Sequence, residues 1–392
     1  MFIHWGVYSA YALHEQALAR CDIDVAEYEK NALLFNPAEY DPEAWVTLAK
    51  EAGMKYICFT AKHHDGFCMW NTKYTEYNVM NTVYGKDTLK MLADACQKHG
   101  MLLSLYYSCP DWNHPYGYNP ASTHQWTAKN IGGEVKTDVY VEYVKNQITE
   151  LLSNYGKIYT LFWDIPPHID VPELNELARR LQPGILINDR GYGPGDFSTP
   201  ERDYTPCDLK RYKRITEACN SVGEISWGYR AEENFHSIRY LIGSIDKIMA
   251  LGGSYLLNVG PDSRGVITEE YARRIKAVGS WYNRLGGVLE CHDADDTDYG
   301  VISNRCIINT KNGKSYFHFY DGIISSSVLL KNPKALPKSV KLLNNGADLE
   351  YKIDKLPRNF GEETILSMSC LVIRNIPVDE LANEAIVIEI EW

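Results

Sequence analysis

The sequence predicts an α/β protein, a (β/α)8-like TIM barrel followed by a C-terminal antiparallel β-sandwich, and three observations lead to this expectation. Over the first 287 residues, apolar runs of strand length alternate with helical patterns, as expected for parallel strands joined by crossover helices. Polar residues gather directly after these runs, where a barrel of this type places its site. From about Gly287 onward, short alternating runs replace the helical patterns. We therefore expect the barrel over residues 1–287 and the sandwich over residues 288–392.

Each expected barrel strand is an apolar run rich in β-branched and aromatic residues. These runs are residues 1–5, 56–61, 102–107, 158–163, 185–187, 225–227 and 255–259. The helices are expected at residues 42–52, 88–99, 139–155, 172–181, 237–251 and 268–285. In the C-terminal part, Gly, Asn, Pro and Asp separate the runs that are expected as sandwich strands, which include residues 300–309, 314–320, 365–373 and 385–392.

Composition and charge exclude several classes of partner. The formal net charge of −11 argues against nucleic acid and anionic membrane surfaces, because both select basic patches. Ten cysteines are scattered without paired spacing, which indicates a reducing compartment. No cationic leader and no membrane-length apolar run is visible in the sequence. We expect a cytoplasmic protein with a small neutral or cationic substrate; an upstream segment stays an open alternative, because Met1 opens directly onto an apolar run.

The segment 60–67, Thr-Ala-Lys-His-His-Asp-Gly-Phe, ends an apolar strand with two imidazoles, a carboxylate and a glycine. A strand that is ending can twist so that both His63 and His64 face one pocket. The alternative is a core histidine beside a solvated one. A metal-dependent hydrolase could use both histidines with Asp65 and Asp164, but no further ligand stands at a recognised metal spacing, so we expect no metal and no cofactor.

Two carboxylates follow neighbouring expected strands. Asp164 ends the run Leu-Phe-Trp-Asp and is followed by Ile-Pro-Pro, which stops the strand. The next strand is followed by Arg190, and Glu201 stands in the loop after it. Paired carboxylates at one barrel mouth, with aromatic walls and hydrogen-bonding histidines around them, favour hydrolysis of a glycosidic bond, because one can attack the anomeric carbon while the other protonates the leaving oxygen.

Several motifs, in a fixed order, carry a resemblance to a known family. They are FIHWGVYS at 2–9, KHHDGF at 62–67, LYYS at 105–108, FWD at 162–164, SWGY at 226–229 and GGSYLLNVGP at 252–261. Together they resemble the α-L-fucosidases of glycoside hydrolase family 29 and cover nearly all of the expected barrel. The resemblance implies a retaining, exo-acting hydrolase of terminal α-L-fucosyl linkages in oligosaccharides or glycoconjugates.

The resemblance also implies residue roles. Asp164 matches the catalytic nucleophile. Glu201 resembles the acid/base of well-matched members, and Glu217 resembles a second glutamate proposed for that role; we favour Glu201, because its loop can reach the leaving-group side. The residues implied to contact the substrate are Phe2, His4, Trp5, Glu15, His63, His64, Tyr106, Arg190 and Trp227. Trp227 could equally belong to the barrel core.

Other functions stay open at this stage. They are fucosyl transfer to a sugar hydroxyl, retaining hydrolysis of another sugar, and noncatalytic carbohydrate binding, although the last would not need both carboxylates. The segment 113–127 contains aromatic residues and a histidine, so it is either part of an acceptor subsite or a solvated loop. A homo-oligomer is neither predicted nor excluded.

Overall fold

The computed structural model describes residues 1–202, 211–290, 293–355 and 369–392. The chain divides into two compact units. The first contains most residues up to Phe235 together with Leu256–Lys276, and the second contains His236–Tyr255 and Ala277–Trp392. The predicted domain boundary between residues 287 and 288 stays a prediction.

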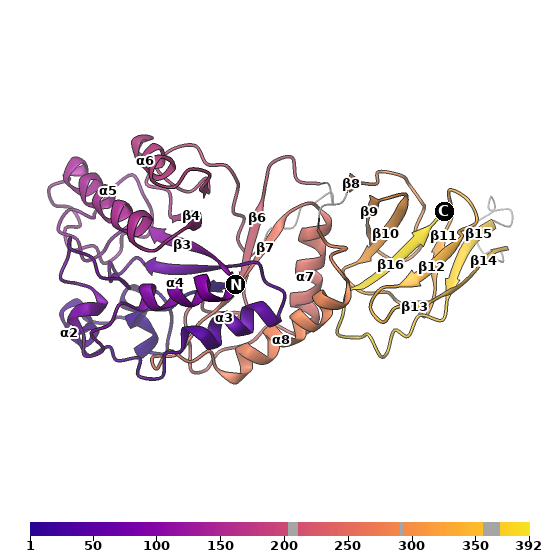
Figure 1. Ribbon diagram of the computed structural model, residues 1–392, viewed down its shortest axis with the longest axis horizontal. Helices are drawn as coiled ribbons and strands as arrows, with labels where there is room; N and C mark the ends of the chain where they lie inside the picture. The colour runs from indigo at the N-terminus through magenta and orange to yellow at the C-terminus, as the bar shows by residue number, and fades with distance from the viewer. Residues whose placement is uncertain (203–210, 291–292, 356–368) are drawn as a thin grey trace. The chain divides into compact units, whose positions relative to one another are not determined.

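A curled parallel sheet of seven strands forms the centre of the barrel (Figure 1). Its strands are β1 (Phe2–Ile3), β2 (Tyr56–Lys62), β3 (Leu102–Ser108), β4 (Ile158–Asp164), β5 (Leu186–Ile187), β6 (Glu217–Ser221) and β7 (Ser254–Val259). The strand order is β5-β4-β3-β2-β1-β7-β6, and pairing is parallel from β5 to β7. The predicted fold class, an α/β barrel, is confirmed.

The segment 197–201 stands where an eighth strand would be. It forms isolated parallel bridges from Phe197 to Asn188, directly after β5, from Ser198 to Thr216, directly before β6, and from Glu201 to Cys219 within β6. These bridges join the two outermost strands of the sheet, so the circle of strands closes through an irregular segment. The sequence offers no apolar run here, and its Pro200 removes a backbone donor, which is why strand periodicity misses it.

The predicted strand at residues 225–227 is wrong. The backbone N–H of Trp227 donates to the Glu15 carboxylate at 2.9 Å, and the N–H of Ile225 donates to Glu233 at 2.9 Å. These side-chain acceptors take the place of a neighbouring strand. The strand at this place in the order is β6, residues Glu217–Ser221, which begins with the glutamate that the sequence suggested as the start of a strand-like segment.

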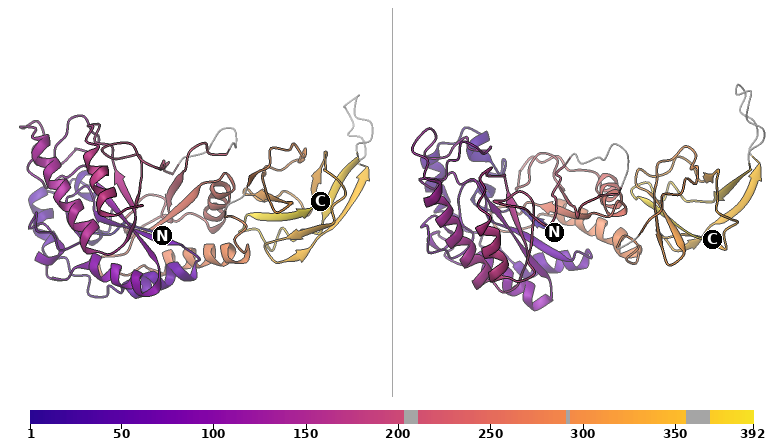
Figure 2. Two further views of the ribbon diagram at one scale, coloured as in Figure 1. Left: turned by 45° about the horizontal axis from the view of Figure 1, so that its top comes forward. Right: turned by 90° about the horizontal axis from the view of Figure 1, so that it is seen from above.

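Helices α3 and α4 pack against β2 and β3 on the outer face of the parallel sheet (Figure 2). The helices are α1 (Ala17–Arg20), α2 (Val25–Ala32), α3 (Pro42–Glu51), α4 (Thr88–His99), α5 (Thr137–Asn154), α6 (Glu173–Leu181), α7 (Ile238–Ala250) and α8 (Glu269–Arg284), with 3-10 turns η1 (Val7–Ala10) and η2 (Val79–Asn81). Side-chain caps begin α3 and α4, where Asp41 and Asp87 accept from backbone N–H groups. None of the described helices has the length and hydropathy needed to cross a membrane.

Alternation along the strands aims the functional side chains into the barrel. Phe2, Tyr106 and Phe162 belong to one buried cluster inside the sheet. Residues two positions further along an extended strand lie on the same face, so His4 and Asp164 also point inward, at the carboxyl ends of β1 and β4. After β1 and at the end of β4, a polar side chain therefore follows the last apolar inward residue and lies at the mouth of the barrel.

A buried ion pair joins the end of β2 to the turn that follows β3. The Lys62 ammonium at the end of β2 lies 2.8 Å from an Asp111 carboxylate oxygen, and both side chains are almost fully buried. The other oxygen of Asp111 accepts backbone N–H groups of Asn113 and His114, at 3.0 and 2.8 Å. A Cβ added to Gly66, whose φ is +79°, would lie 2.2 Å from the same carboxylate. The turn after His64 therefore requires glycine.

The second unit contains two antiparallel sheets. The larger has the order β13-β12-β16-β10-β9-β8 and the smaller β11-β15-β14. Their strands are β8 (Asp293–Ala294), β9 (Ile307–Lys311), β10 (Lys314–Phe319), β11 (Val328–Leu330), β12 (Ser339–Leu342), β13 (Ala347–Asp348), β14 (Glu350–Lys355), β15 (Ser369–Arg374) and β16 (Ile386–Glu391). Phe319 and Ile388 of the larger sheet share one core with Leu330 and Leu371 of the smaller. The predicted sandwich is confirmed; residues 365–368 of the predicted strand 365–373 lie outside the described residues.

The Lys62–Asp111 pair yields a stability prediction. Asp111→Ala leaves the Lys62 ammonium buried without its carboxylate, so we expect the free energy of unfolding to fall by about 3–5 kcal/mol, measured by urea titration. The control, Lys98→Ala, breaks the exposed pair of Lys98 with Glu43 and should change the unfolding midpoint little. Equal midpoints for the Asp111 variant and wild type would contradict the structural role of the pair.

Candidate active site

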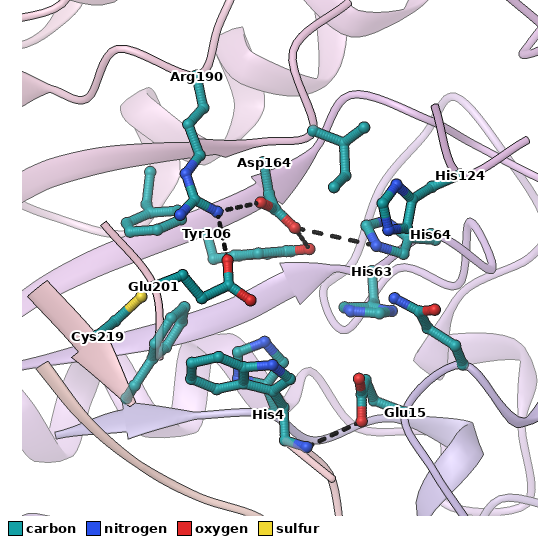
Figure 3. A pocket seen from close by; sticks show the side chains of 15 residues that line it. His4, Glu15, His63, His64, Tyr106, His124, Asp164, Arg190, Glu201 and Cys219 are labelled. Atoms are coloured by element: carbon teal, nitrogen blue, oxygen red, sulfur yellow. Dashed lines mark hydrogen bonds and ion pairs between the residues drawn. The ribbon is translucent and has the colours of Figure 1, made fainter. Parts of the chain in front are cut away.

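A pocket of about 420 Å³, including its open mouth, lies at the carboxyl ends of the barrel strands (Figure 3). Its walls combine aromatic rings, imidazoles and carboxylates from strands and from the segment 197–201. The lining residues are Phe2, His4, Glu15, Gln16, His63, His64, Tyr106, His124, Phe162, Asp164, Ile165, Arg190, Glu201, Cys219 and Trp227. The structure thus brings together all predicted site residues except Trp5 and Glu217.

Asp164 occupies the end of β4 and is held on both oxygens. Its Oδ1 accepts from Arg190 Nη1 at 3.0 Å, and its Oδ2 accepts from the Tyr106 hydroxyl at 2.7 Å. The next residue, Ile165, has φ of +58°, a region that β-branched residues rarely adopt. The strand is therefore broken directly after the carboxylate by a strained residue, and the Asp164 side chain has a fixed orientation.

Arg190 connects the two predicted catalytic carboxylates, as Figure 3 shows. The same nitrogen, Nη1, lies 3.0 Å from Asp164 Oδ1 and 2.9 Å from Glu201 Oε2, while Nη2 donates to the carbonyl of Thr199. Because both oxygens contact one nitrogen, they lie within about 6 Å of each other, close to the spacing of a retaining pair. Asp164 is buried, whereas 41% of the Glu201 side chain is exposed at the mouth.

The charge of Asp164 is stabilised against its burial. Burial alone would raise the pKa of this carboxyl, but the Arg190 guanidinium and the Tyr106 hydrogen bond together hold its pKa below the usual value. Asp164 is consequently ionised at neutral pH. An ionised carboxylate at the bottom of a pocket can act as a nucleophile.

The hydrogen bonds of His64 determine which ring nitrogen faces the pocket as an acceptor. The Ser108 hydroxyl donates to the carbonyl of Pro110 at 2.7 Å, so it accepts from His64 Nδ1–H, also at 2.7 Å. Burial lowers the pKa of His64 to about 4, so the ring is neutral. Its Nε2, 3.9 Å from Asp164 Oδ2, therefore carries a lone pair and can accept from a ligand hydroxyl.

His4 is arranged in the same way. The amide nitrogen of Asn258 donates to the carbonyl of Trp227 at 2.7 Å, which leaves the amide oxygen to accept from His4 Nδ1–H at 2.7 Å. Burial lowers the pKa of His4 to about 4. This ring is also neutral, and its Nε2 is an acceptor. Two neutral imidazoles that follow different strands, His4 after β1 and His64 after β2, thus offer lone pairs to the hydroxyls of a polyol.

His63 lies between these two rings. Its ring centroid is 4.1 Å from that of His64 and 5.7 Å from that of Tyr106, on which it stacks. Burial lowers its pKa well below the usual value, and its buried Nδ1 has no hydrogen-bond partner among the residues that the structure describes. The pairing of β2 with β3 shifts between Thr60 and Lys62, which lets both successive histidines reach one pocket. The predicted convergence of the two histidines is confirmed.

Glu15 positions the loop that carries Trp227. One carboxylate oxygen accepts from the Ser226 hydroxyl at 2.8 Å and from the Trp227 N–H at 2.9 Å. The Trp227 ring lies 5.2 Å from the ring of His4 and 6.1 Å from that of Phe2. Trp227 therefore both lines the pocket and joins the buried barrel cluster, so the two alternatives considered from the sequence are not exclusive.

The structure places Glu217 and Trp5 away from the pocket. Glu217 is the first residue of β6 and accepts from the hydroxyl of Tyr56, the first residue of β2, so it lies at the amino ends of the strands, opposite the mouth. Trp5 is fully buried, and its indole N–H donates to the carbonyl of Asp262 at 2.8 Å. Neighbouring motif residues alternate in direction, so the pocket receives His4 and the helix-facing core receives Trp5.

Asp65 also turns away from the pocket. Its two oxygens accept from the Tyr28 hydroxyl at 2.8 Å and from the backbone N–H of Phe67 at 3.1 Å. Among the described residues, no three His, Cys, Asp or Glu side chains converge as a metal site. The ligand set that the metal-dependent alternative would use, His63, His64, Asp65 and Asp164, is therefore not assembled.

Five lining residues were not singled out as site residues from the sequence. They are Gln16, His124, Phe162, Ile165 and Cys219. Phe162 and Cys219 are inward strand positions and could have been found by counting two residues back from Asp164 and along β6. His124 comes from the long segment after β3, which reaches the pocket only through tertiary contacts.

A carboxylate pair among aromatic rings at the mouth of a (β/α)8-like barrel defines a glycoside hydrolase. The family model of the α-L-fucosidases matches residues 1–287, and the chain belongs to this family.

Relatives and solved structures agree with this assignment. Tissue α-L-fucosidase of Rattus norvegicus is 29% identical over 393 aligned residues, which cover 91% of this chain and 82% of that protein. α-L-Fucosidase isoenzyme 1 from Paenibacillus thiaminolyticus has a TM-score of 0.84 at 30% identity, covering 100% of this chain and 96% of that one. A trapped covalent intermediate of an α-L-fucosidase from Bacteroides thetaiotaomicron has a TM-score of 0.78 at 25% identity, covering 100% and 93%.

The buried position of Glu217 predicts a pH effect on stability. Burial raises its pKa from 4.5 to about 8, so over this range the folded chain holds a proton that the unfolded chain releases, and stability is lost as the pH rises. Glu217→Gln is neutral throughout. We expect it to unfold at higher urea concentration than wild type at pH 9 and at a similar concentration at pH 4.

The exposed Glu134, with 70% of its side chain accessible, provides the control Glu134→Gln, which should show no such difference. An effect of Glu217→Gln that is the same at both pH values would contradict the raised pKa.

Proposed function

We propose that this chain is a retaining, exo-acting α-L-fucosidase that releases terminal α-L-fucose by double displacement, with Asp164 as nucleophile and Glu201 as acid/base. The observation that carries the proposal is the pair of carboxylates on the single nitrogen Arg190 Nη1. Their spacing of about 6 Å or less leaves no room for a water molecule between nucleophile and sugar, as an inverting enzyme needs. The family membership supports the choice of sugar.

In the first step, a carboxylate oxygen of Asp164 attacks the anomeric carbon, and the bond from that carbon to the leaving oxygen breaks. Glu201 in its protonated form gives its proton to the leaving oxygen, so the aglycone departs as a neutral alcohol. The exposed position of Glu201 suits this role, because the aglycone leaves through the mouth while the sugar stays at the buried Asp164. The product of this step is a covalent β-fucosyl ester of Asp164.

In the second step, water enters from the mouth and Glu201, now ionised, removes its proton. The oxygen of this water attacks the anomeric carbon and the ester bond to Asp164 breaks. α-L-Fucose is released, Asp164 is again a carboxylate and Glu201 is again protonated. Arg190 contacts both carboxylates and can stabilise whichever one is ionised at each stage.

The remaining pocket residues provide recognition. His4 and His64 offer ring nitrogens as acceptors for sugar hydroxyls, as their hydrogen bonds to Asn258 and Ser108 indicate. The Phe2, Phe162 and Trp227 rings form an apolar wall, which suits the methyl group and the apolar face of a deoxysugar.

We propose a cytoplasmic location from the scattered cysteines of the sequence. Every cysteine within the described ranges is a free thiol, which supports a reducing compartment. Fractionation of the native host cells tests this proposal, and recovery of the enzyme outside the cell would contradict it.

Azide rescue tests the two catalytic roles. With an aryl α-L-fucoside, Asp164→Ala should be inactive alone and should give β-fucosyl azide when azide is added, since azide then attacks from the vacant nucleophile side. Glu201→Ala should lose roughly 10²–10⁴-fold in hydrolysis and give the α-azide, because azide intercepts the fucosyl ester. Product anomers are identified by NMR.

Glu217→Gln is the matched control carboxylate and should retain wild-type hydrolysis without rescue. An α-azide from the Asp164 variant, or rescue of the Glu217 variant in place of the Glu201 variant, would overturn the assignment.

The Arg190 contact predicts a change in the pH profile. Asp164 must be ionised to attack, and Arg190 helps to lower its pKa, so Arg190→Gln should raise that pKa and move the acidic limb of kcat/KM to higher pH. Arg190→Lys, which keeps the charge, should move it less. Arg273→Gln, an exposed arginine on α8, is the control. An unchanged acidic limb in Arg190→Gln would contradict the electrostatic role.

A further inference from the structure

Trp126 is an unusual tryptophan in this chain because 52% of its surface is exposed. The other eight tryptophans, all within the described residues, are buried or half-buried. A large indole left in solvent loses the stabilisation that burial would provide, so its position requires another explanation.

The Trp126 ring has two close neighbours that connect it to the active-site pocket. The Arg20 guanidinium lies over the ring, 5.2 Å from its centroid, and the His124 ring lies 4.8 Å away. Arg20 Nε also donates to the Gln16 amide oxygen at 2.6 Å. Both Gln16 and His124 line the pocket, so each neighbour of Trp126 connects directly to it.

The segment that carries Trp126 is anchored beside the catalytic strand ends. The Ser122 hydroxyl donates to the carbonyl of Pro166 at 2.8 Å, two residues after Asp164. The carbonyl of His124 accepts from the Trp112 indole at 2.7 Å, and the Trp112 N–H donates to the carbonyl of His64 at 2.8 Å. The segment before the exposed ring is therefore held by backbone carbonyls of His64 and His124, which line the pocket, and of Pro166, which follows Asp164.

The mouth is the side on which an aglycone must lie. A terminal fucose bound with its anomeric carbon beside Asp164, before the glycosidic bond breaks, directs its leaving oxygen toward Glu201, the exposed carboxylate. The next sugar of an oligosaccharide then extends past the rim. A pyranose presents a face of C–H groups, which packs well on an aromatic ring held flat by a cation on its other side.

We propose that Trp126 is the stacking platform for the sugar that bears the fucose, and that Arg20 is its positioning residue. The inference rests on the proposed fucosidase function and names its substrate class: oligosaccharides in which fucose is attached to another pyranose, in preference to substrates without a sugar aglycone. Neither residue touches the reacting bond. Their effect is confined to substrates whose leaving group occupies the rim.

The experiment compares two substrates that share the fucosyl group. α-L-Fucosyl fluoride has a leaving group too small to reach the rim, and the second substrate is whichever of the 1→2, 1→3, 1→4 or 1→6 linked fucosyl disaccharides wild type cleaves fastest. Trp126→Ala should lower kcat/KM for the disaccharide roughly 5–10-fold, as loss of one aromatic stacking contact predicts, and leave the fluoride unchanged. Trp126→Phe should retain most of the disaccharide activity.

Two further variants separate stacking from general effects of the substitution. Tyr74→Ala removes a comparably exposed aromatic ring, 45% accessible and not part of the pocket lining, and should change neither substrate. Arg20→Gln should lower disaccharide kcat/KM through KM, with the fluoride unchanged, and Arg20→Lys should restore part of the loss because a cation again lies over the ring.

Each outcome decides a separate question. If Trp126→Ala lowers both substrates equally, or neither, the platform is overturned while the fucosidase function stands. If wild-type enzyme hydrolyses neither the fluoride nor any disaccharide, the proposed function itself fails. Selective loss on the disaccharide, restored by phenylalanine, supports the assignment.

Discussion

The site depends on one guanidinium that contacts two carboxylates through the same nitrogen. Arg190 follows the short strand β5, Asp164 ends β4 and Glu201 closes the irregular segment 197–201, so the contact joins three neighbouring parts of the barrel wall. It shortens the distance between the two acids and lowers the pKa of the buried one. The exposed one, Glu201, lies at the mouth in contact with solvent. The Arg190 contact thus holds the two carboxylates close together, one buried and one exposed.

Burial gives the histidines their chemical character. Rings that would titrate near neutral pH in water are kept neutral here, because the barrel interior disfavours the imidazolium, and their outer hydrogen bonds to Ser108 and Asn258 select the tautomer. A neutral acceptor can bind a sugar hydroxyl without adding positive charge beside the nucleophile. The buried Lys62–Asp111 pair supports this arrangement by fixing the turns after β2 and β3.

Local patterns predicted much of this arrangement. Helices with clear amphipathic periodicity, such as α4 (Thr88–His99), begin and end where the sequence indicates, because an aspartate cap and a left-handed glycine mark their ends. The predicted strand at 225–227 is wrong for a specific reason: its backbone N–H groups donate to the carboxylates of Glu15 and Glu233 and not to a neighbouring strand. Glu15 is 212 residues away from Trp227 in the chain, and Glu233 is 8 residues away from Ile225. An apolar run alone cannot reveal such partners.

The sequence by itself determined the fold class and the family and indicated Asp164 as the candidate nucleophile, because strand alternation, motif order and a carboxylate at a strand end are local properties. The tertiary structure decided that Glu201 lines the pocket and Glu217 does not, since only the direction of β6 reveals that Glu217 lies at the amino ends of the strands. It also shows that His4 lines the pocket while Trp5 is buried away from it, and that His124 reaches the pocket. The physical reason is that contacts between residues far apart in the chain determine which end of a strand faces the mouth. The same kind of contact determines which other segments surround that end.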